Sequence, residues 1–210
     1  MASTDPPASS TDETVSAAAT APSSLLSSPL GDDPMHDDGH THYDVSAPVV
    51  YFYRCQDAQL GHLSNFYASA IYLDGERWPT TEHYFQAAKF TDVPNYQREI
   101  RLASTPGKAA RMGRSRAHPL RADWETVKET IMERAVFAKY TQHANLATQL
   151  LATGSSLLVE HTFNDVYWAD GGGDGRGLNR LGVILMRVHT WLLQQPPPSP
   201  RRGKRSHVDC

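Results

Sequence analysis

Long polar stretches at both ends confine any folded domain to the middle of this chain. Residues 1–46 are dominated by Ser, Thr, Ala, Pro and Asp, and they hold eight acidic side chains but no Lys or Arg. Residues 196–210 are rich in Pro and carry four basic side chains. Neither composition buries enough apolar surface to offset the chain entropy that folding removes. We therefore predict two disordered tails and one folded domain over residues 47–195.

The predicted domain contains about 150 residues, which is enough for one hydrophobic core. The whole chain carries a net charge of −3, but residues 47–195 alone carry +2 because the acidic tail outweighs the basic one. A nearly neutral domain does not indicate a nucleic-acid partner. Two cysteines, no apolar stretch of membrane-spanning length and no signal peptide predict a soluble cytoplasmic protein without a membrane partner. The basic RRGKR stretch leaves a nuclear location open.

Apolar periodicity predicts mostly helices with a few short strands. Strands are expected at 47–55 and 156–162, and Asp74-Gly75 indicates a hairpin within 71–79. Thr105 and Asp123 are the expected N-caps of two of the helices. The predicted helices cover six segments, which are 81–90, 94–103, 104–114, 122–143, 145–154 and 179–195. These elements predict a compact, mainly helical α+β single domain with a small β-sheet.

Glu82 stands in the first turn of the helix expected at 81–90, within the aromatic stretch WPTTEHYFQAAKF. At about 100° per residue, Glu82, Phe85, Gln86 and Lys89 share one helix face. One interpretation is a surface carboxylate that the helix dipole favours. The other is a polar stripe facing a pocket floored by aromatic rings, where a carboxylate works as acid or base. The spacing alone leaves both open.

A glycine-rich stretch lies between the second predicted strand and the last predicted helix, in the sequence LVEHTFNDVYWADGGGDGRGLNRLG. A loop that leads into a helix N-terminus suits phosphate, because the first N–H groups of the helix lack intrahelical partners. Arg176, Asn179 and Arg180 favour an anionic ligand here. The stretch matches neither a Walker A motif nor a dinucleotide fingerprint. A plain connecting loop therefore remains the alternative.

Asp165 and Trp168 lie beside this loop, and Trp124 begins the longest predicted helix. Each of them alone is explained by a turn or by packing. Together with Glu82 they fit a pocket for a sugar joined to a planar base. Aromatic rings stack on the base, and carboxylates stabilise the positive charge that grows on the sugar as a glycosidic bond breaks.

Two further stretches hold candidate ligands of other kinds. In GHLSNFY, Asn65 and Phe66 offer an amide and an aromatic face to a base, although a turn with an anchored Phe explains them equally well. HDDGHTH, at 36–42, places three His near two Asp in the predicted acidic tail and is at best a weak metal site. The domain itself lacks the Cys/His spacing of a zinc site, so we predict no metal and no cofactor.

Three long segments of the domain resemble the NADAR domain, and within it the YbiA-like proteins. They begin with GHLSNFYASAIYLDGERWPTTEHYFQAAKF, continue with ARMGRSRAHPLRADWETVKETIMERAVFAKYTQHANLATQLLATG, and end with LVEHTFNDVYWADGG and GRGLNRLGVILMRV. The resemblance covers roughly residues 50–192. One departure is Trp168-Ala169-Asp170, where the family usually has Trp-Gly-Asp, and the glycine stretch is also longer. Both changes bear on substrate choice.

The resemblance implies an N-glycosidase whose substrates are phosphoribosylamino pyrimidine intermediates of riboflavin biosynthesis. Hydrolysis would release ribose 5-phosphate and a free aminopyrimidine. The positions that match the family motifs are Glu82, Trp124, Asp165 and Trp168. We expect Glu82 to act as base and Asp165 as its partner, with Trp124 or Trp168 stacked on the base.

Three cations, Lys89, Arg176 and Arg180, are expected to meet the substrate phosphate. Two other functions remain open. One is an ADP-ribosyl hydrolase that acts on ADP-ribosylated guanine in nucleic acid, for which the basic tail could supply charge. The other is a non-catalytic module that binds ADP-ribose or NAD. The intact pair Glu82 and Asp165 argues against a pure binder, and the sequence does not predict an oligomeric state.

Overall fold

The computed structural model describes residues 46–174 and 176–195. Most of both predicted tails lies outside the described residues, and so do the HDDGHTH and RRGKR stretches. Gly175 of the glycine-rich loop is also outside them.

Helices make up most of the described residues, as the sequence predicts. The α-helices are α1 (Thr81–Ala87), α2 (Pro94–Arg101), α3 (Pro106–Arg114), α4 (Trp124–Gln142), α5 (Ala144–Leu151) and α6 (Arg180–Leu193). Two single turns of 3-10 helix accompany them, η1 (Gly61–Leu63) and η2 (Ala88–Phe90). The predicted helix 81–90 is α1 followed directly by η2. Each of the other predicted helices is present and ends within a few residues of its predicted bounds.

Side chains cap the start of two of the helices, and at a third predicted N-cap the capping hydrogen bond is absent. Thr80 accepts a hydrogen bond from the N–H of His83 at the start of α1, and Thr105 does the same for Lys108 in α3. Asp123 precedes α4 but makes no capping bond. Its carboxylate instead binds the Arg121 guanidinium through two contacts of 2.6 and 2.8 Å. Asp123 is thus the N-cap residue of α4, as predicted, but its side chain does not cap the helix because an arginine two residues earlier takes its oxygens.

The strands form two separate pairs. β1 (Val49–Phe52) and β4 (Leu157–Glu160) are parallel, with Val49 opposite Leu157 and Phe52 opposite Glu160. β2 (Ile71–Leu73) and β3 (Glu76–Trp78) form the predicted antiparallel hairpin. The turn residues Asp74 and Gly75 both have positive φ.

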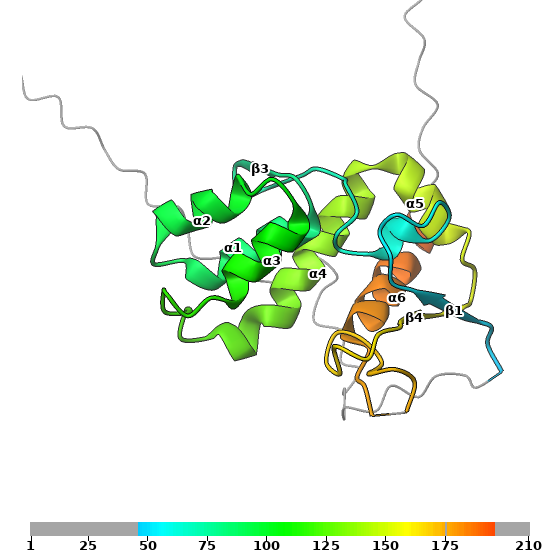
Figure 1. Ribbon diagram of the computed structural model, residues 1–210. Helices are drawn as coiled ribbons and strands as arrows, with labels where there is room; N and C mark the ends of the chain where they lie inside the picture. The colour runs from blue at the N-terminus through cyan, green and yellow to red at the C-terminus, as the bar shows by residue number, and fades with distance from the viewer. Residues whose placement is uncertain (1–45, 175, 196–210) are drawn as a thin grey trace, which may run out of the picture.

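Helix α4 runs through the centre of the molecule. Figure 1 shows α1, α2 and α3 on one side of it, and α5, α6, β1 and β4 on the other. Its predicted apolar face is confirmed, since Ile131, Ala135 and Ala138 are buried. Met132 and Val136 are buried as well, so α4 contributes to the core on more than one face. The mainly helical α+β fold thus has its core around one helix, and no helix in the described ranges is both long and apolar enough to span a membrane.

Candidate active site

Glu82 is buried at the start of α1, with 6% of its surface exposed. The segment before the β2–β3 hairpin holds this end of α1 in place. The carbonyl of Asn65 accepts hydrogen bonds from the Glu82 N–H and from the Thr81 hydroxyl. The Nε2 of Gln86, one turn along the helix, donates to Glu82 Oε1 over 2.8 Å. A buried and hydrogen-bonded carboxylate favours the pocket interpretation over the exposed surface row.

The pKa of the Glu82 carboxyl is raised above its ordinary value, chiefly because burial disfavours the charged form. The hydrogen bond from Gln86 and the positive charges of Lys89 and Arg114 oppose this rise. The negative charge of Asp165 adds to it. Asp165 is more than eighty residues away in the sequence, so folding brings the two predicted carboxylates within electrostatic reach of each other.

Phe85 joins the two predicted tryptophans. Its ring centroid is 5.0 Å from that of Trp124 and 5.3 Å from that of Trp168, with the Trp168 ring edge-on to it. Trp124 is buried, whereas Trp168 is half-buried and also contacts Tyr167. The predicted face of α1 therefore does point at aromatic rings contributed by α4 and by the β4–α6 connection.

Lys89 lies over the same rings, with its ammonium 5.4 Å from the centroid of Phe85 and 5.3 Å from that of Trp124. The pKa of this ammonium is lowered to about 8, chiefly by burial and also by repulsion from Arg116 and Arg114, while Glu82 opposes the change. In the described part of the chain, neither Arg114 nor Arg116 forms an ion pair with a carboxylate. Two cations, Lys89 and Arg114, thus act on Glu82, and Arg116 acts on Lys89.

Asp165 is half-buried, and its side chain fixes the turn that carries Trp168. Its Oδ1 accepts hydrogen bonds from the N–H groups of Tyr167 and Trp168, over 2.8 and 2.7 Å. Asp165 therefore organises a turn, as one interpretation expects, and its charge also acts on Glu82, while its catalytic role stays a prediction.

Glu160 is a third carboxylate whose charge acts together with those of Glu82 and Asp165, and it was not predicted from the sequence. It ends β4, where its N–H donates to the side-chain oxygen of Asn179 and its carbonyl accepts from the N–H of Asp170. Burial, together with the negative charges of Asp165, Glu82 and Asp170, raises the pKa of its carboxyl to about 8. The available signal was a Glu at the C-terminal end of an apolar strand, directly before the glycine-rich loop.

The glycine-rich loop folds in a way that contradicts its predicted phosphate site. The N–H groups of Leu178, Arg180 and Leu181 donate to the carbonyls of residues 166, 167 and 168, and the N–H of Asn179 to that of residue 169. The start of α6 therefore offers few free N–H groups to a phosphate. The glycines serve close packing instead: a Cβ on Gly177 would lie 2.1 Å from the backbone of Asp170.

The other residues predicted to contact the ligand are distributed unevenly. Asn179 is buried and bridges the Glu160 N–H and the Leu158 carbonyl, so its amide is already engaged and it serves β4 rather than a phosphate. Arg176 binds Asp174, and 83% of its side chain is exposed. Arg180 pairs with Glu129 over 2.9 Å. Each of these three predicted side chains is therefore engaged by another residue, in β4, in the loop or in α4.

The predicted amide and aromatic pair of the GHLSNFY stretch lies just before α1. The side chain of Asn65 donates to Met132 Sδ and accepts from the Thr81 hydroxyl, so it holds the helix start rather than a base. Phe66 is half-buried beside it. Ala169, the departure from the family pattern, is fully buried, and its carbonyl accepts the Asn179 N–H.

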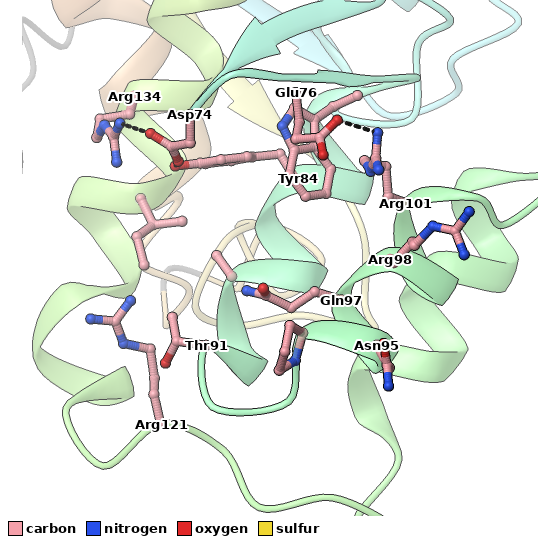
Figure 2. A pocket seen from close by; sticks show the side chains of 14 residues that line it. Asp74, Glu76, Tyr84, Thr91, Asn95, Gln97, Arg98, Arg101, Arg121 and Arg134 are labelled. Carbon is pink, nitrogen blue, oxygen red and sulfur yellow. Dashed lines mark hydrogen bonds and ion pairs between the residues drawn. The ribbon is translucent and has the colours of Figure 1, made fainter. Parts of the chain in front are cut away.

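A hollow of about 520 Å³ lies on the other face of α1, lined by Tyr84 and Ala88 (Figure 2). Two of its arginines pair with carboxylates: Arg134 with Asp74, and Arg101 with Glu76, as the dashed lines in Figure 2 show. Glu82 is not among the residues that line this hollow, so the hollow is not the candidate active site. Substitutions in it serve as controls for substitutions near Glu82. Among residues 46–174 and 176–195, no group of three His, Cys, Asp or Glu side chains is placed to hold a metal ion.

Comparison with known families decides where the chain belongs. The family model of the NADAR domain matches residues 51–193, which is more than half of the chain. The chain belongs to the NADAR family.

Relatives in this family carry informative names. The N-glycosidase YbiA of Escherichia coli is 54% identical over 144 residues, which are 69% of this chain and 88% of that protein. A riboflavin biosynthesis protein of Vibrio vulnificus is 41% identical over 159 residues, 74% of this chain but 42% of that protein. The NMR structure of E. coli YbiA aligns with a TM-score of 0.65 at 48% identity, over 78% of this chain and 96% of that one. The α+β prediction is confirmed, and the predicted enzyme class, a glycosidase acting on N-glycosyl bonds, is confirmed through the names of these NADAR relatives.

Proposed function

We propose that this NADAR protein hydrolyses the N-glycosidic bond of phosphoribosylamino pyrimidine intermediates of riboflavin biosynthesis and releases ribose 5-phosphate. The observation that carries the proposal is the meeting of Glu82, Asp165, Trp124 and Trp168 in one cluster, although they come from three distant segments. The names of relatives that act as N-glycosidases or in riboflavin biosynthesis support the choice of bond and of substrate class.

The carboxylates suit the charge that develops during this reaction. Cleavage of the C1–N bond leaves an oxocarbenium-like sugar, which a nearby negative charge stabilises. Glu82 takes a proton from the attacking water, and its hydrogen bond from Gln86 orients the carboxylate for this task. Asp165 stabilises the sugar cation and positions its hydroxyls. The half-buried Trp168 stacks on the departing base.

The substrate phosphate is met by Lys89 and Arg114 rather than by the start of α6. These cations lie next to Glu82, and Arg114 is exposed and without a carboxylate partner among the described residues. A phosphate dianion relieves the mutual repulsion of the cations and forms charge-assisted hydrogen bonds with them. We no longer assign phosphate binding to Arg176 and Arg180, because they already pair with Asp174 and Glu129.

Product analysis by mass spectrometry tests the proposal. Purified protein is incubated with the phosphoribosylamino pyrimidine in one tube and with ADP-ribosylated guanine DNA in another. We expect ribose 5-phosphate in the first tube only, and a loss of at least about a hundredfold in rate for Glu82→Gln. Release of ADP-ribose in the second tube would favour the nucleic-acid hydrolase. Nucleotide binding without any product would favour the non-catalytic module, and full activity of Glu82→Gln would refute the assignment of Glu82.

A further inference from the structure

Lys139 of α4 is a buried cation to which the proposed mechanism gives no role. Only 1% of its surface is exposed, and among the described residues no carboxylate forms an ion pair with it. Its Nζ donates to the carbonyl of Ser64 over 2.9 Å, and it lies 5.6 and 5.5 Å from the ring centroids of Tyr67 and Tyr140. A buried charge without a counter-charge is costly, so an apolar side chain of similar size at this position would be at least as stable.

The residue that Lys139 holds leads directly to the start of α1. Ser64 precedes Asn65 in the chain, and the carbonyl of Asn65 accepts the Glu82 N–H over 3.2 Å and the Thr81 hydroxyl over 2.9 Å. Because the peptide unit between Ser64 and Asn65 is planar, a shift of the first carbonyl moves the backbone of Asn65 with it. Two hydrogen bonds and one short backbone segment therefore connect the ammonium to the backbone of Glu82.

We propose that Lys139 is a positioning residue for this site, whose ammonium fixes the Ser64–Asn65 segment and thereby sets the place of Glu82. The inference rests on the proposed N-glycosidase function and adds to it a residue that contacts neither the substrate nor the Glu82 carboxylate. An ammonium forms a shorter and stronger hydrogen bond with a carbonyl than a neutral donor does. A fraction of an ångström at the catalytic carboxylate is enough to change the rate.

Other contacts hold the same segment, so that loss of the ammonium displaces it without unfolding it. The Tyr140 hydroxyl donates to the carbonyl of His62 over 3.0 Å, and the side chain of Asn65 donates to Met132 Sδ over 3.2 Å. The carbonyl of Ser64 also accepts the N–H of residue 67 over 3.2 Å, so it keeps a donor when the ammonium is gone.

The titratable groups that face Lys139 make its charge sensitive to pH. They are Cys55 before η1, His62 in η1, Tyr67 after it and Tyr140 on α4. Burial and the positive charge of Lys139 lower the pKa of His62 to about 4, so this imidazole is neutral at pH 7. The pKa of the Lys139 ammonium is lowered to about 7, chiefly by burial, while Cys55 opposes the change. The ammonium and the amine therefore coexist near neutral pH.

Lys139→Met tests the role, because Met keeps an apolar stem of similar length and lacks the charge and the donors. With the phosphoribosylamino pyrimidine as substrate, we expect kcat to fall about 10- to 100-fold and KM to stay within about twofold. The midpoint of urea denaturation should be unchanged or higher. Leu146→Ala, at a buried position of α5, is the control: the cavity lowers its midpoint while kcat is kept.

Two results would overturn the positioning role. One is an unchanged kcat in Lys139→Met. The other is a fall of its urea midpoint as large as that of Leu146→Ala, which is the result that a merely structural lysine gives. Inactivity of the unaltered enzyme on this substrate would instead refute the proposed function.

Nuclear magnetic resonance of the unaltered protein provides a measurement that does not depend on activity. The signals of the Lys139 ε-carbon and of the Glu82 amide are followed from pH 5 to pH 9. Both should change with one midpoint near pH 7, and this step of the amide signal should be absent from Lys139→Met. An amide signal of Glu82 that does not follow the lysine would overturn the proposal, and this criterion decides if the variant does not fold or the enzyme shows no activity.

Discussion

Replacing Glu160 by Gln should stabilise the protein at alkaline pH and have little effect at acid pH. Gln has nearly the same shape as a protonated Glu, so the change removes the ability to ionise and leaves the packing intact. The carboxyl has a pKa of about 8 in the folded protein, against an ordinary value of 4.5. Below pH 4.5 both the folded and the unfolded chain hold the proton, and ionisation of this group does not alter stability.

Between these two pKa values only the unfolded chain releases the proton. The free energy of unfolding then falls by about 1.4 kcal/mol for each pH unit. Across the whole interval the loss reaches roughly 5 kcal/mol, which is an upper bound because local relaxation and entering water reduce it. Above pH 8 the folded chain ionises too, and the loss stays constant. Glu160→Gln escapes this loss.

Denaturation with urea at pH 5.5, 7 and 8.5 measures the effect in the unaltered protein, in Glu160→Gln and in the exposed control Glu76→Gln. The stability advantage of Glu160→Gln should grow with pH and exceed about 2 kcal/mol at pH 8.5. Glu76→Gln should run parallel to the unaltered protein. An advantage that is constant across pH, or a variant that is less stable at pH 8.5, would refute the conclusion that the half-buried Glu160 carboxyl is neutral in the folded protein.

Two further substitutions have matched controls. Gly113→Ala places a Cβ 1.8 Å from the side-chain oxygen of Gln86, which should cost about 1–3 kcal/mol in urea denaturation and lower kcat at least about tenfold by displacing the catalytic carboxylate. Gly107→Ala, in the same helix with its nearest neighbouring atoms 4.0 Å away, should leave both quantities unchanged. Arg114→Gln should raise KM about tenfold for the phosphorylated substrate but not for its dephosphorylated form. Arg98→Gln, in the hollow, should change neither KM. If Arg114→Gln has the same KM for the phosphorylated substrate as the unaltered protein, Arg114 does not bind the phosphate.

Local chemistry explains which parts of the site the sequence could predict. The face that joins Glu82 to Phe85 and Lys89 follows from helix geometry alone, because residues three, four and seven apart must lie together. Thr105 caps its helix because a hydroxyl at that position has the N–H of residue 108 within reach. Both are consequences of short-range spacing.

The remaining features depended on contacts between distant segments. The glycine-rich stretch alone does not predict that the carbonyls of residues 166–169 accept hydrogen bonds from the N–H groups at the start of α6. Glu160 was overlooked for a similar reason, since an acidic residue at the end of an apolar strand has no special meaning until Glu82 and Asp165 are placed near it. Asn179 was assigned to a ligand because the sequence cannot show that β4 already uses its amide.

The parallel pairing of β1 with β4 also determines when this site can form. The two strands lie about a hundred residues apart in the chain, so their pairing closes a large loop and comes at a high entropic cost early in folding. The helical half around Glu82 involves mostly local contacts and can form sooner. Glu160 and Asp165 therefore reach Glu82 late in folding. Intermediates that already contain most of the helices should still be inactive, and recovery of activity during refolding should lag behind recovery of helical circular dichroism.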